Sequence, residues 1–307
     1  MIKEGTLALI NNTPLVLLDK LEPGRRLYAK LEFVHPGGSV KDRVAYQMIR
    51  DAYANGALKQ GQVVVEMTSG NMGAGLAVVC KQFGNPFVAV MSEGNSPERR
   101  RMLKALGAEL VLTKQVDGTP GRVTGNDIAY AGEVAKEYAA RNGAFYVDQF
   151  NNPSNVLAHY NTTGPEIWND LPDIEAFIAS VGSGGTFVGT STFLKSQHKN
   201  IRCIACEPEN AAILKTGTVK SSTHIIQGTG YGIIPPHWRA DLADDIITVS
   251  DEQVREITKR LSHEQGLFVG YSSGANVAGA LNYLTHHPSI KKMVTILCDT
   301  GYKYSDL

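Results

Sequence analysis

A lysine placed directly behind a glycine-containing turn is the first residue in this sequence whose position suggests chemistry. In EFVHPGGSVKDR, residues 32–43, a Pro-Gly-Gly turn leads into Lys41 at an expected helix start. Ser39 and Asp42 match an S-x-x-D capping box, which would make Ser39 the N-cap and Lys41 the second helical residue. The helix dipole disfavours a charged amine there. Lys41 is therefore either a solvated surface residue or a neutral amine that can attack carbonyl groups.

A glycine-rich turn at residues 180–189, SVGSGGTFVG, has the composition of a phosphate site. Its glycines leave room for an anion, and its hydroxyl groups would lie at the positive end of a predicted helix that begins near Thr186. The glycines are Gly182, Gly184 and Gly185, and the hydroxyl residues are Ser183 and Thr186. Because the turn lacks the lysine of a GxxxxGK[ST] loop, it favours a dianionic phosphate over a magnesium–nucleotide complex.

Two further turns offer polar groups at predicted helix starts. EMTSGNMG, residues 66–73, has short polar side chains that could bind an anion, with an ordinary capped turn as the alternative. These side chains belong to Thr68, Ser69 and Asn71. In GYSSGANVAG, residues 270–279, Ser272 and Ser273 either contact a ligand or cap the helix, and the turn alone favours capping.

The elements that must position these turns follow an α/β pattern. Short apolar, β-branched runs alternate with helical patterns, which is typical of mostly parallel sheets covered by helices on both faces. Strands are predicted at 62–68, 86–92, 108–113, 176–182, 202–208, 245–250 and 293–299, and helices at 41–56, 74–84, 96–107, 131–143, 251–266 and 274–287. Two sheets in two lobes are expected, with a change of lobe near residues 143–152; one large sheet is the alternative. Residues 115–127 are predicted to form a mobile loop.

The composition argues against several classes of function. The 307 residues carry thirty basic and thirty acidic side chains, so no net charge attracts nucleic acid or an anionic membrane. No segment resembles a signal peptide or a transmembrane helix. The four cysteines are too few and scattered for a disulfide framework, which predicts a reducing, cytoplasmic setting. Cys203 and Cys206 form a CxxC that is interpreted as part of a buried strand, and no metal site is expected.

The phosphate turn at residues 180–189, a carboxylate-binding turn at residues 66–73 and Lys41 together suggest pyridoxal 5′-phosphate (PLP). The sequence resembles the cysteine synthase (O-acetylserine sulfhydrylase) and cystathionine β-synthase family of PLP enzymes over almost its whole length. The resemblance rests on NNTPLVLL, PGGSVKDR, TSGNMG, SPERR, DQFNNPSN, AHYNTTGPEIW, GSGGT, IQGTGYGIIP and GLFVGYSSGANVAGAL, in this order. It implies the two-lobed PLP fold type II, similar to the tryptophan synthase β-subunit. It also implies a larger PLP-binding domain over 1–37 and 148–307, a smaller mobile substrate-binding domain over 38–147, and a homodimer.

The resemblance implies a role for each matching residue. Lys41 corresponds to the Schiff-base lysine and general base, Asn71 to the ligand of the PLP ring hydroxyl, and Ser272 to the partner of the pyridine nitrogen. The phosphate loop corresponds to Gly182, Ser183, Gly184, Gly185 and Thr186. The ligands of the substrate carboxylate correspond to Thr68, Ser69 and Gln149, with Met72 in the same turn.

The implied reaction is β-replacement at an O-activated serine through an aminoacrylate intermediate, foremost cysteine synthesis from O-acetylserine and sulfide. The alternative is a cystathionine β-synthase-like or cysteine-consuming reaction, with serine or cysteine as donor and water or hydrogen sulfide released. A hydro-lyase that yields pyruvate has less support. An inactive scaffold is disfavoured because the lysine and the cofactor motifs are intact.

Three positions depart from the family pattern. Met72 replaces the second threonine of TSGNTG, which removes a hydroxyl donor and argues against ordinary handling of O-acetylserine. Tyr231 resembles the tyrosine of cystathionine β-synthases, and it either assists a poor leaving group or only packs over the site. His35 stands where asparagine is usual. The sequence has no haem-binding extension or C-terminal regulatory domain, which argues against the animal-type cystathionine synthase.

Overall fold

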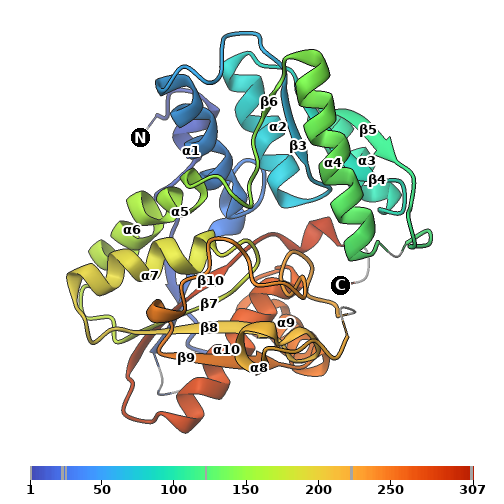
Figure 1. Ribbon diagram of the computed structural model, residues 1–307. Coiled ribbons are helices and arrows are strands. Elements are labelled where there is room, and N and C mark those ends of the chain that lie inside the picture. Colours follow the sequence, from blue (N-terminus) through green and yellow to red (C-terminus); the bar gives the residue numbers. More distant parts are fainter. Residues whose placement is uncertain (1, 22–23, 25, 122, 222–223, 305–306) are drawn as a thin grey trace. The chain divides into compact units, whose positions relative to one another are not determined.

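The computed structural model describes residues 2–21, 24, 26–121, 123–221, 224–304 and 307. The chain divides into two compact units, and Figure 1 shows the helices and strands of each. The first unit consists of Met1–Ile10 and His35–Asn155, and the second of Asn11–Val34 and Val156–Leu307.

The first unit is built on a four-stranded parallel sheet in the order β5-β4-β3-β6. Its strands are β3 (Val64–Met67), β4 (Phe87–Ser92), β5 (Glu109–Thr113) and β6 (Phe145–Tyr146). All of β4 is buried, as expected of a central strand with helices over both faces. All carboxyl ends of these parallel strands lie at one edge, which is where an α/β sheet presents its ligand-binding turns.

Helices cover this sheet, and two of them pack closely together. They are α1 (Lys41–Ala54), α2 (Asn71–Phe83), α3 (Pro97–Ala105) and α4 (Gly125–Asn142). Ala131 and Ala135 of α4 pack against apolar residues of β3 and β4. Helices α1 and α2 lie side by side (Figure 1), and a Cβ at Gly75 of α2 would be only 3.0 Å from the carbonyl oxygen of Lys41. Glycine at position 75 therefore lets α2 approach the N-terminus of α1 closely.

The second unit contains a six-stranded sheet in the order β1-β2-β10-β7-β8-β9. Strand β1 is antiparallel to β2, and the other neighbouring pairs are parallel. The strands are β1 (Leu15–Leu17), β2 (Arg26–Leu31), β7 (Ala176–Ser180), β8 (Arg202–Pro208), β9 (Asp245–Val249) and β10 (Lys292–Leu297). Its helices include the π-helical turn η3 (His159–Thr163), α6 (Gly164–Asp170), α7 (Gly185–Gln197), α8 (Ile213–Thr216), α9 (Asp251–Gln265) and α10 (Tyr271–His286). Helix α5 (Ser154–Ala158) spans the boundary between the units, which falls after Asn155.

The residue alternation of β7 separates the two faces of this sheet. Ala176 and Ile178 belong to a core cluster that includes Ala275 and Val277 of α10 and Val254 of α9. The alternate residues of β7 point to the opposite face. Helix α7 contacts β7 and also packs with η3 and α6 (Figure 1). The helices α7 and α10, which begin at two of the predicted ligand-binding turns, are thus both anchored on β7.

The predicted α/β class with two mostly parallel sheets is confirmed. Each predicted strand and helix is present, whereas the strands β1, β2 and β6 and the short helices α5, α6 and α8 were not predicted. Helix α4 begins at Gly125 rather than at residue 131, because Thr124 and Asp127 form a capping box. The end of the predicted 115–127 loop is therefore helical, and its Arg122 lies outside the described residues. Across the described ranges, no helix is long and apolar enough to cross a membrane.

Candidate functional site

Lys41 is the first residue of α1, and the predicted capping box is corrected in its details. The N-cap is Val40, so Lys41 occupies the first helical position rather than the second. The hydroxyl of Ser39 accepts a hydrogen bond from the Lys41 N–H at 3.3 Å. The Asp42 carboxylate accepts from the Gly37 N–H at 2.5 Å, so it braces the preceding turn. Lys41 remains within the first helical turn, where the dipole favours a neutral amine.

The predicted carboxylate-binding turn connects β3 to α2 in the same unit. Thr68 is buried, and its hydroxyl accepts a hydrogen bond from the Gly73 N–H at 3.0 Å, which closes the turn. Asn71 is the first residue of α2, and Met72, the second, is 3% exposed. Four backbone N–H groups at the start of such a helix lack intrahelical acceptors, so the turn can donate to an anion.

Arg99 contacts this turn and was not singled out from the sequence. Its Nη1 donates to the Ser69 hydroxyl oxygen at 3.1 Å. Because the guanidinium uses the oxygen as an acceptor, the hydroxyl proton of Ser69 is left to donate to another group. The SPERR motif contains Arg99, but only the tertiary contact shows which residue it meets.

Gln149 follows β6, and β6 is hydrogen-bonded to β3. Its backbone N–H lies 3.5 Å from Oε1 of Glu66, and its carbonyl oxygen accepts from Asn155 Nδ2 at 2.8 Å. The carboxyl ends of neighbouring parallel strands meet at the same sheet edge. The first unit therefore brings together the β3–α2 turn with Thr68 and the segment with Gln149.

The predicted phosphate turn lies between β7 and α7 in the second unit. Gly184 is the N-cap of α7 with φ 93°, a left-handed conformation that favours glycine. A Cβ at Gly182 would lie 2.2 Å from the carbonyl oxygen of Gly228, so this position also requires glycine. Gly185 begins the helix, and the hydroxyl residues are the buried Ser183 and the partly buried Thr186.

His159 supports the phosphate turn, and sequence reasoning gave it no role. It is fully buried in η3, and its Nε2 lies 3.2 Å from the hydroxyl oxygen of Thr186. Its Nδ1 lies 2.9 Å from the hydroxyl oxygen of Thr163. A π-helical turn is rare and frequently marks a functional site, which is a structural signal that the AHYNTTGPEIW motif alone did not provide.

Ser272 is the second residue of α10 and is buried. The N-cap of α10 is Gly270 with no side-chain capping bond, so the capping role considered for Ser272 and Ser273 is wrong. Further along α10, Asn276 Oδ1 accepts from the Ser180 N–H at 2.7 Å, and its Nδ2 donates to the Ile296 carbonyl at 2.8 Å. Asn276 thus ties the helix that carries Ser272 to the strand end from which the phosphate turn starts.

Tyr231 lies in the long connection between α8 and β9. Its side chain is 38% exposed, and it stands between Gly230 and Gly232, both with positive φ. A half-exposed phenol on such a backbone is accessible to a ligand from solvent. This position is compatible with both roles considered for Tyr231.

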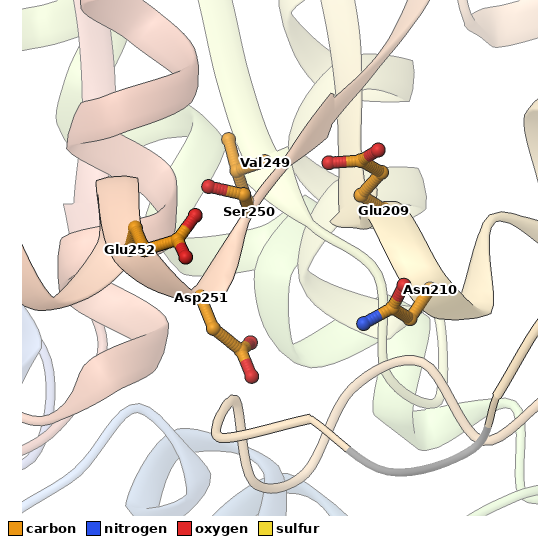
Figure 2. Close-up of a pocket in the computed structure, with 6 residues that line it drawn as sticks. All are labelled: Glu209, Asn210, Val249, Ser250, Asp251 and Glu252. Carbon is orange, nitrogen blue, oxygen red and sulfur yellow. The ribbon is translucent and has the colours of Figure 1, made fainter.

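Figure 2 shows a cavity of about 330 Å³ in the second unit, at the carboxyl ends of β8 and β9. It is lined by Glu209, Asn210, Val249, Ser250, Asp251 and Glu252. Three of these side chains are carboxylates, which would repel a phosphate or a substrate carboxylate. The hydroxyl of Ser250 already accepts from the Gln253 N–H in a capping box. This cavity therefore does not serve the predicted anion-binding chemistry.

The residues of the β7–α7 turn fit the phosphate of PLP. The turn combines two positions at which a side chain is excluded, two hydroxyl groups and the N-terminus of the 13-residue helix α7. No acidic side chain occurs within residues 182–186. This donor set suits a dianion without a metal ion.

Comparison with known proteins identifies the family. The model of the family described as pyridoxal-phosphate dependent enzyme matches residues 6–299. A cysteine synthase of Staphylococcus aureus strain N315 is 39% identical over 300 residues, which cover 96% of this chain and 93% of the relative.

Two solved structures are also similar over the whole chain. O-ureido-L-serine synthase superposes with a TM-score of 0.92 at 37% identity, covering 100% of this chain and 95% of that one. A hydrogen sulfide-producing enzyme of Fusobacterium nucleatum has a TM-score of 0.91 at 34% identity, covering 99% and 98%. The predicted PLP enzyme fold is thereby confirmed, and the chain belongs to the family of pyridoxal-phosphate-dependent enzymes.

Proposed function

We propose that the protein catalyses a PLP-dependent β-replacement that makes cysteine from O-acetylserine and sulfide. The observation that carries this proposal is the near full-length identity to a cysteine synthase, together with the intact lysine and phosphate motifs. In this reaction the bond from the β-carbon to the acetate oxygen breaks and a bond from the β-carbon to sulfur forms. The proton lost from the α-carbon is returned to it when the product forms.

Lys41 has two proposed tasks. Its Nζ would hold the cofactor covalently, and its amine would also act as the general base that removes the α-proton of the substrate. The first-turn position of Lys41 supports both tasks, because the helix dipole favours the neutral amine. PLP, when bound, supplies an electron sink for the negative charge that develops at the α-carbon.

The remaining cofactor ligands are proposed from three helix starts, those of α7, α2 and α10. The phosphate is bound by the β7–α7 turn, namely Gly182, Ser183, Gly184, Gly185 and Thr186. Asn71, at the start of α2, donates to the ring hydroxyl oxygen, and Ser272, at the start of α10, faces the pyridine nitrogen. A neutral hydroxyl at that nitrogen, instead of a carboxylate, does not favour its protonation.

Thr68, Ser69 and Gln149 are proposed to bind the substrate carboxylate. Their support is the sheet edge that they share and the N-terminus of α2, which favours an anion. Met72 lies in the same turn and places a buried thioether where the family pattern has a hydroxyl. Residues 38–147 are proposed to form the smaller domain that moves when the substrate binds.

The proposed setting is the cytoplasm, and the proposed assembly is a homodimer. All four cysteines are free thiols, which suits a reducing compartment. The homodimer follows from the family resemblance, and light scattering of the purified protein would measure the mass of the assembly.

A donor and acceptor screen tests the proposed function. The purified PLP-loaded protein is mixed with O-acetylserine and sulfide, and cysteine formation is measured. O-phosphoserine, serine and cysteine are compared as donors, and homocysteine and cysteine as acceptors. We expect cysteine from O-acetylserine and sulfide. No cysteine from that pair, with turnover of another pair, would overturn cysteine synthesis while retaining β-replacement.

A second candidate function is release of hydrogen sulfide from cysteine, with a thiol as acceptor. Tyr231 is the candidate general acid for it, because a phenol can donate a proton to a poor leaving group. The similarity to the hydrogen sulfide-producing enzyme favours it. Sulfide production from cysteine plus homocysteine that is faster than cysteine synthesis would establish this alternative as the main reaction.

A further inference from the structure

Glu66 is a buried carboxyl group that the proposed chemistry does not use. It lies in β3 and is only 1% exposed. Burial raises its pKa to about 8, although hydrogen bonds from the Asp148 and Gln149 backbone lower it. A carboxyl in an otherwise apolar strand is costly to bury, so its partners indicate what it contributes.

Glu66 extends the contact between β3 and β6 beyond the end of the sheet. The last ladder bond runs from the Val147 N–H to the Val65 carbonyl, at 3.1 Å. The next N–H group, that of Asp148, donates instead to Glu66 Oε2 at 2.8 Å, and the Gln149 N–H lies 3.5 Å from Oε1. One side chain thus receives the two N–H groups that follow the strand.

The segment held in this way contains a residue with an uncommon backbone conformation. Asp148 has φ 53°, a left-handed conformation that is uncommon for a residue other than glycine. Such a conformation persists only where surrounding contacts fix it. The hydrogen bond to Glu66 and the one between Asn155 Nδ2 and the Gln149 carbonyl are contacts of this kind.

We propose that Glu66 is a positioning residue, which holds Gln149 in register with Thr68 so that both can bind the substrate carboxylate. Glu66 precedes Thr68 by two residues on β3, so its contact with Gln149 fixes the two carboxylate-binding segments relative to each other. Glu66 itself does not touch the substrate. This inference rests on the proposed function and on the role of Gln149 in it.

The chain offers a matched control in Glu207. This residue is also buried in a parallel strand, β8, and its carboxyl also accepts from two consecutive backbone N–H groups. These belong to Leu214 and Lys215 of α8, at 3.0 and 2.8 Å. Because α8 carries none of the proposed ligands, Glu207→Gln makes the same chemical change without a proposed effect on substrate binding.

The test compares Glu66→Gln, Glu66→Asp, Glu207→Gln and Gln149→Ala as PLP-loaded enzymes. In Glu66→Gln the amide nitrogen replaces a carboxyl oxygen and faces an N–H donor, so at least one hydrogen bond is lost. We expect the KM for O-acetylserine to rise about tenfold, with the KM for sulfide and the cofactor absorbance unchanged. Glu207→Gln should keep the wild-type KM. Combined with Gln149→Ala, Glu66→Gln should raise the KM little further, because both changes act through one residue.

Each result has a defined consequence. A wild-type KM in Glu66→Gln, an equal rise in Glu207→Gln, or full additivity with Gln149→Ala would overturn the positioning role. If Glu66→Gln does not fold, Glu66→Asp, which keeps the carboxyl group but shortens its reach, must show the rise in the KM for O-acetylserine. If the wild-type enzyme makes no cysteine, the proposed function and this inference both fail. If it makes cysteine and Glu66→Gln has the wild-type KM for O-acetylserine, only this inference fails.

Discussion

The hydroxyl oxygen of Thr186 lies 3.2 Å from Nε2 of His159. Thr186 belongs to the proposed phosphate turn, and His159 is buried in the π-helical turn, where its other nitrogen contacts Thr163. The imidazole thereby connects the α7 N-terminus to a separate element of the same unit. It fixes the orientation of the Thr186 hydroxyl before any ligand arrives.

Substitution of His159 should weaken PLP binding by an amount that depends on which ring-nitrogen contact the new side chain keeps. The amide of Gln can reproduce the Nε2 contact with Thr186, whereas the amide of Asn reproduces only the Nδ1 contact with Thr163. We expect His159→Asn to raise the Kd for PLP about fivefold to tenfold, for a hydrogen bond of about 1 kcal/mol, and His159→Gln to raise it less. Absorbance titration of the apo-protein measures both. Equal Kd values for the two variants would show that the Thr186 contact is unimportant.

Met72→Thr should improve the use of O-acetylserine. The change introduces a hydroxyl at the start of α2, where it can donate to the substrate carboxylate. A gain of about 1 kcal/mol corresponds to a roughly fivefold rise in kcat/KM. Met72→Val is the control, because valine has the shape of threonine without the hydroxyl, and both variants leave a similar cavity. Equal kcat/KM values for O-acetylserine in Met72→Thr and Met72→Val would reject a role for the hydroxyl.

Tyr231→Phe should separate donors by their leaving groups. Acetate leaves without a proton, so we expect the rate with O-acetylserine to be unchanged. Serine and cysteine release poorer leaving groups, so their rates should fall about 100-fold if the phenol acts as a general acid. Steady-state rates with each donor check this, and an equal change for all donors would mean that Tyr231 only packs over the site.

The stability of the folded protein should depend on pH through Glu66. Burial, with the nearby Asp148 charge, raises its pKa from 4.5 to about 8 despite hydrogen bonds that lower it. Between these values the folded state keeps a proton that the unfolded state releases, so this group makes the free energy of unfolding fall as pH rises. The slope is up to about 1.4 kcal/mol per pH unit. Urea unfolding from pH 5 to pH 8, at saturating PLP, should show a shallower slope for Glu66→Gln. If the free energy of unfolding depends on pH in the same way in the wild type and in Glu66→Gln, the pKa of Glu66 is not raised.

Strong local patterns made most of the fold predictable. The central strand β4, Phe87–Ser92, is a continuous apolar run bounded by turn residues, which is typical of a buried parallel strand. Strand β2 contains Lys30, and the sequence alone gives no reason to bury a lysine there. The structure does, because Lys30 Nζ lies 3.1 Å from Glu166 and 3.2 Å from Asp170. That pairing is a tertiary contact between distant segments, so no local pattern reveals it.

In the candidate site, too, features visible in a local pattern were predictable, and features that depend on tertiary contacts were not. The glycines at 182 and 184 were predictable because exclusion of a side chain leaves a trace in the residue type itself. The roles of Glu66, Arg99 and His159 were not, because each depends on which distant group its side chain meets. The capping box predicted for Ser39 and Asp42 was wrong in detail because Asp42 reaches back to Gly37.

Reduction with borohydride shows whether Lys41 binds PLP covalently. Reduction makes the link between lysine and cofactor permanent, so that mass spectrometry of peptides identifies the residue. We predict that the protein absorbs near ~410–420 nm, as a lysine-bound cofactor does. Its pyridoxyl group should map to Lys41, and the exposed Lys59→Ala variant should match the wild type in both respects. The Lys41→Ala variant should lose the band and the label. A label on another lysine, or a band that survives in Lys41→Ala, would show that Lys41 is not the residue that binds PLP.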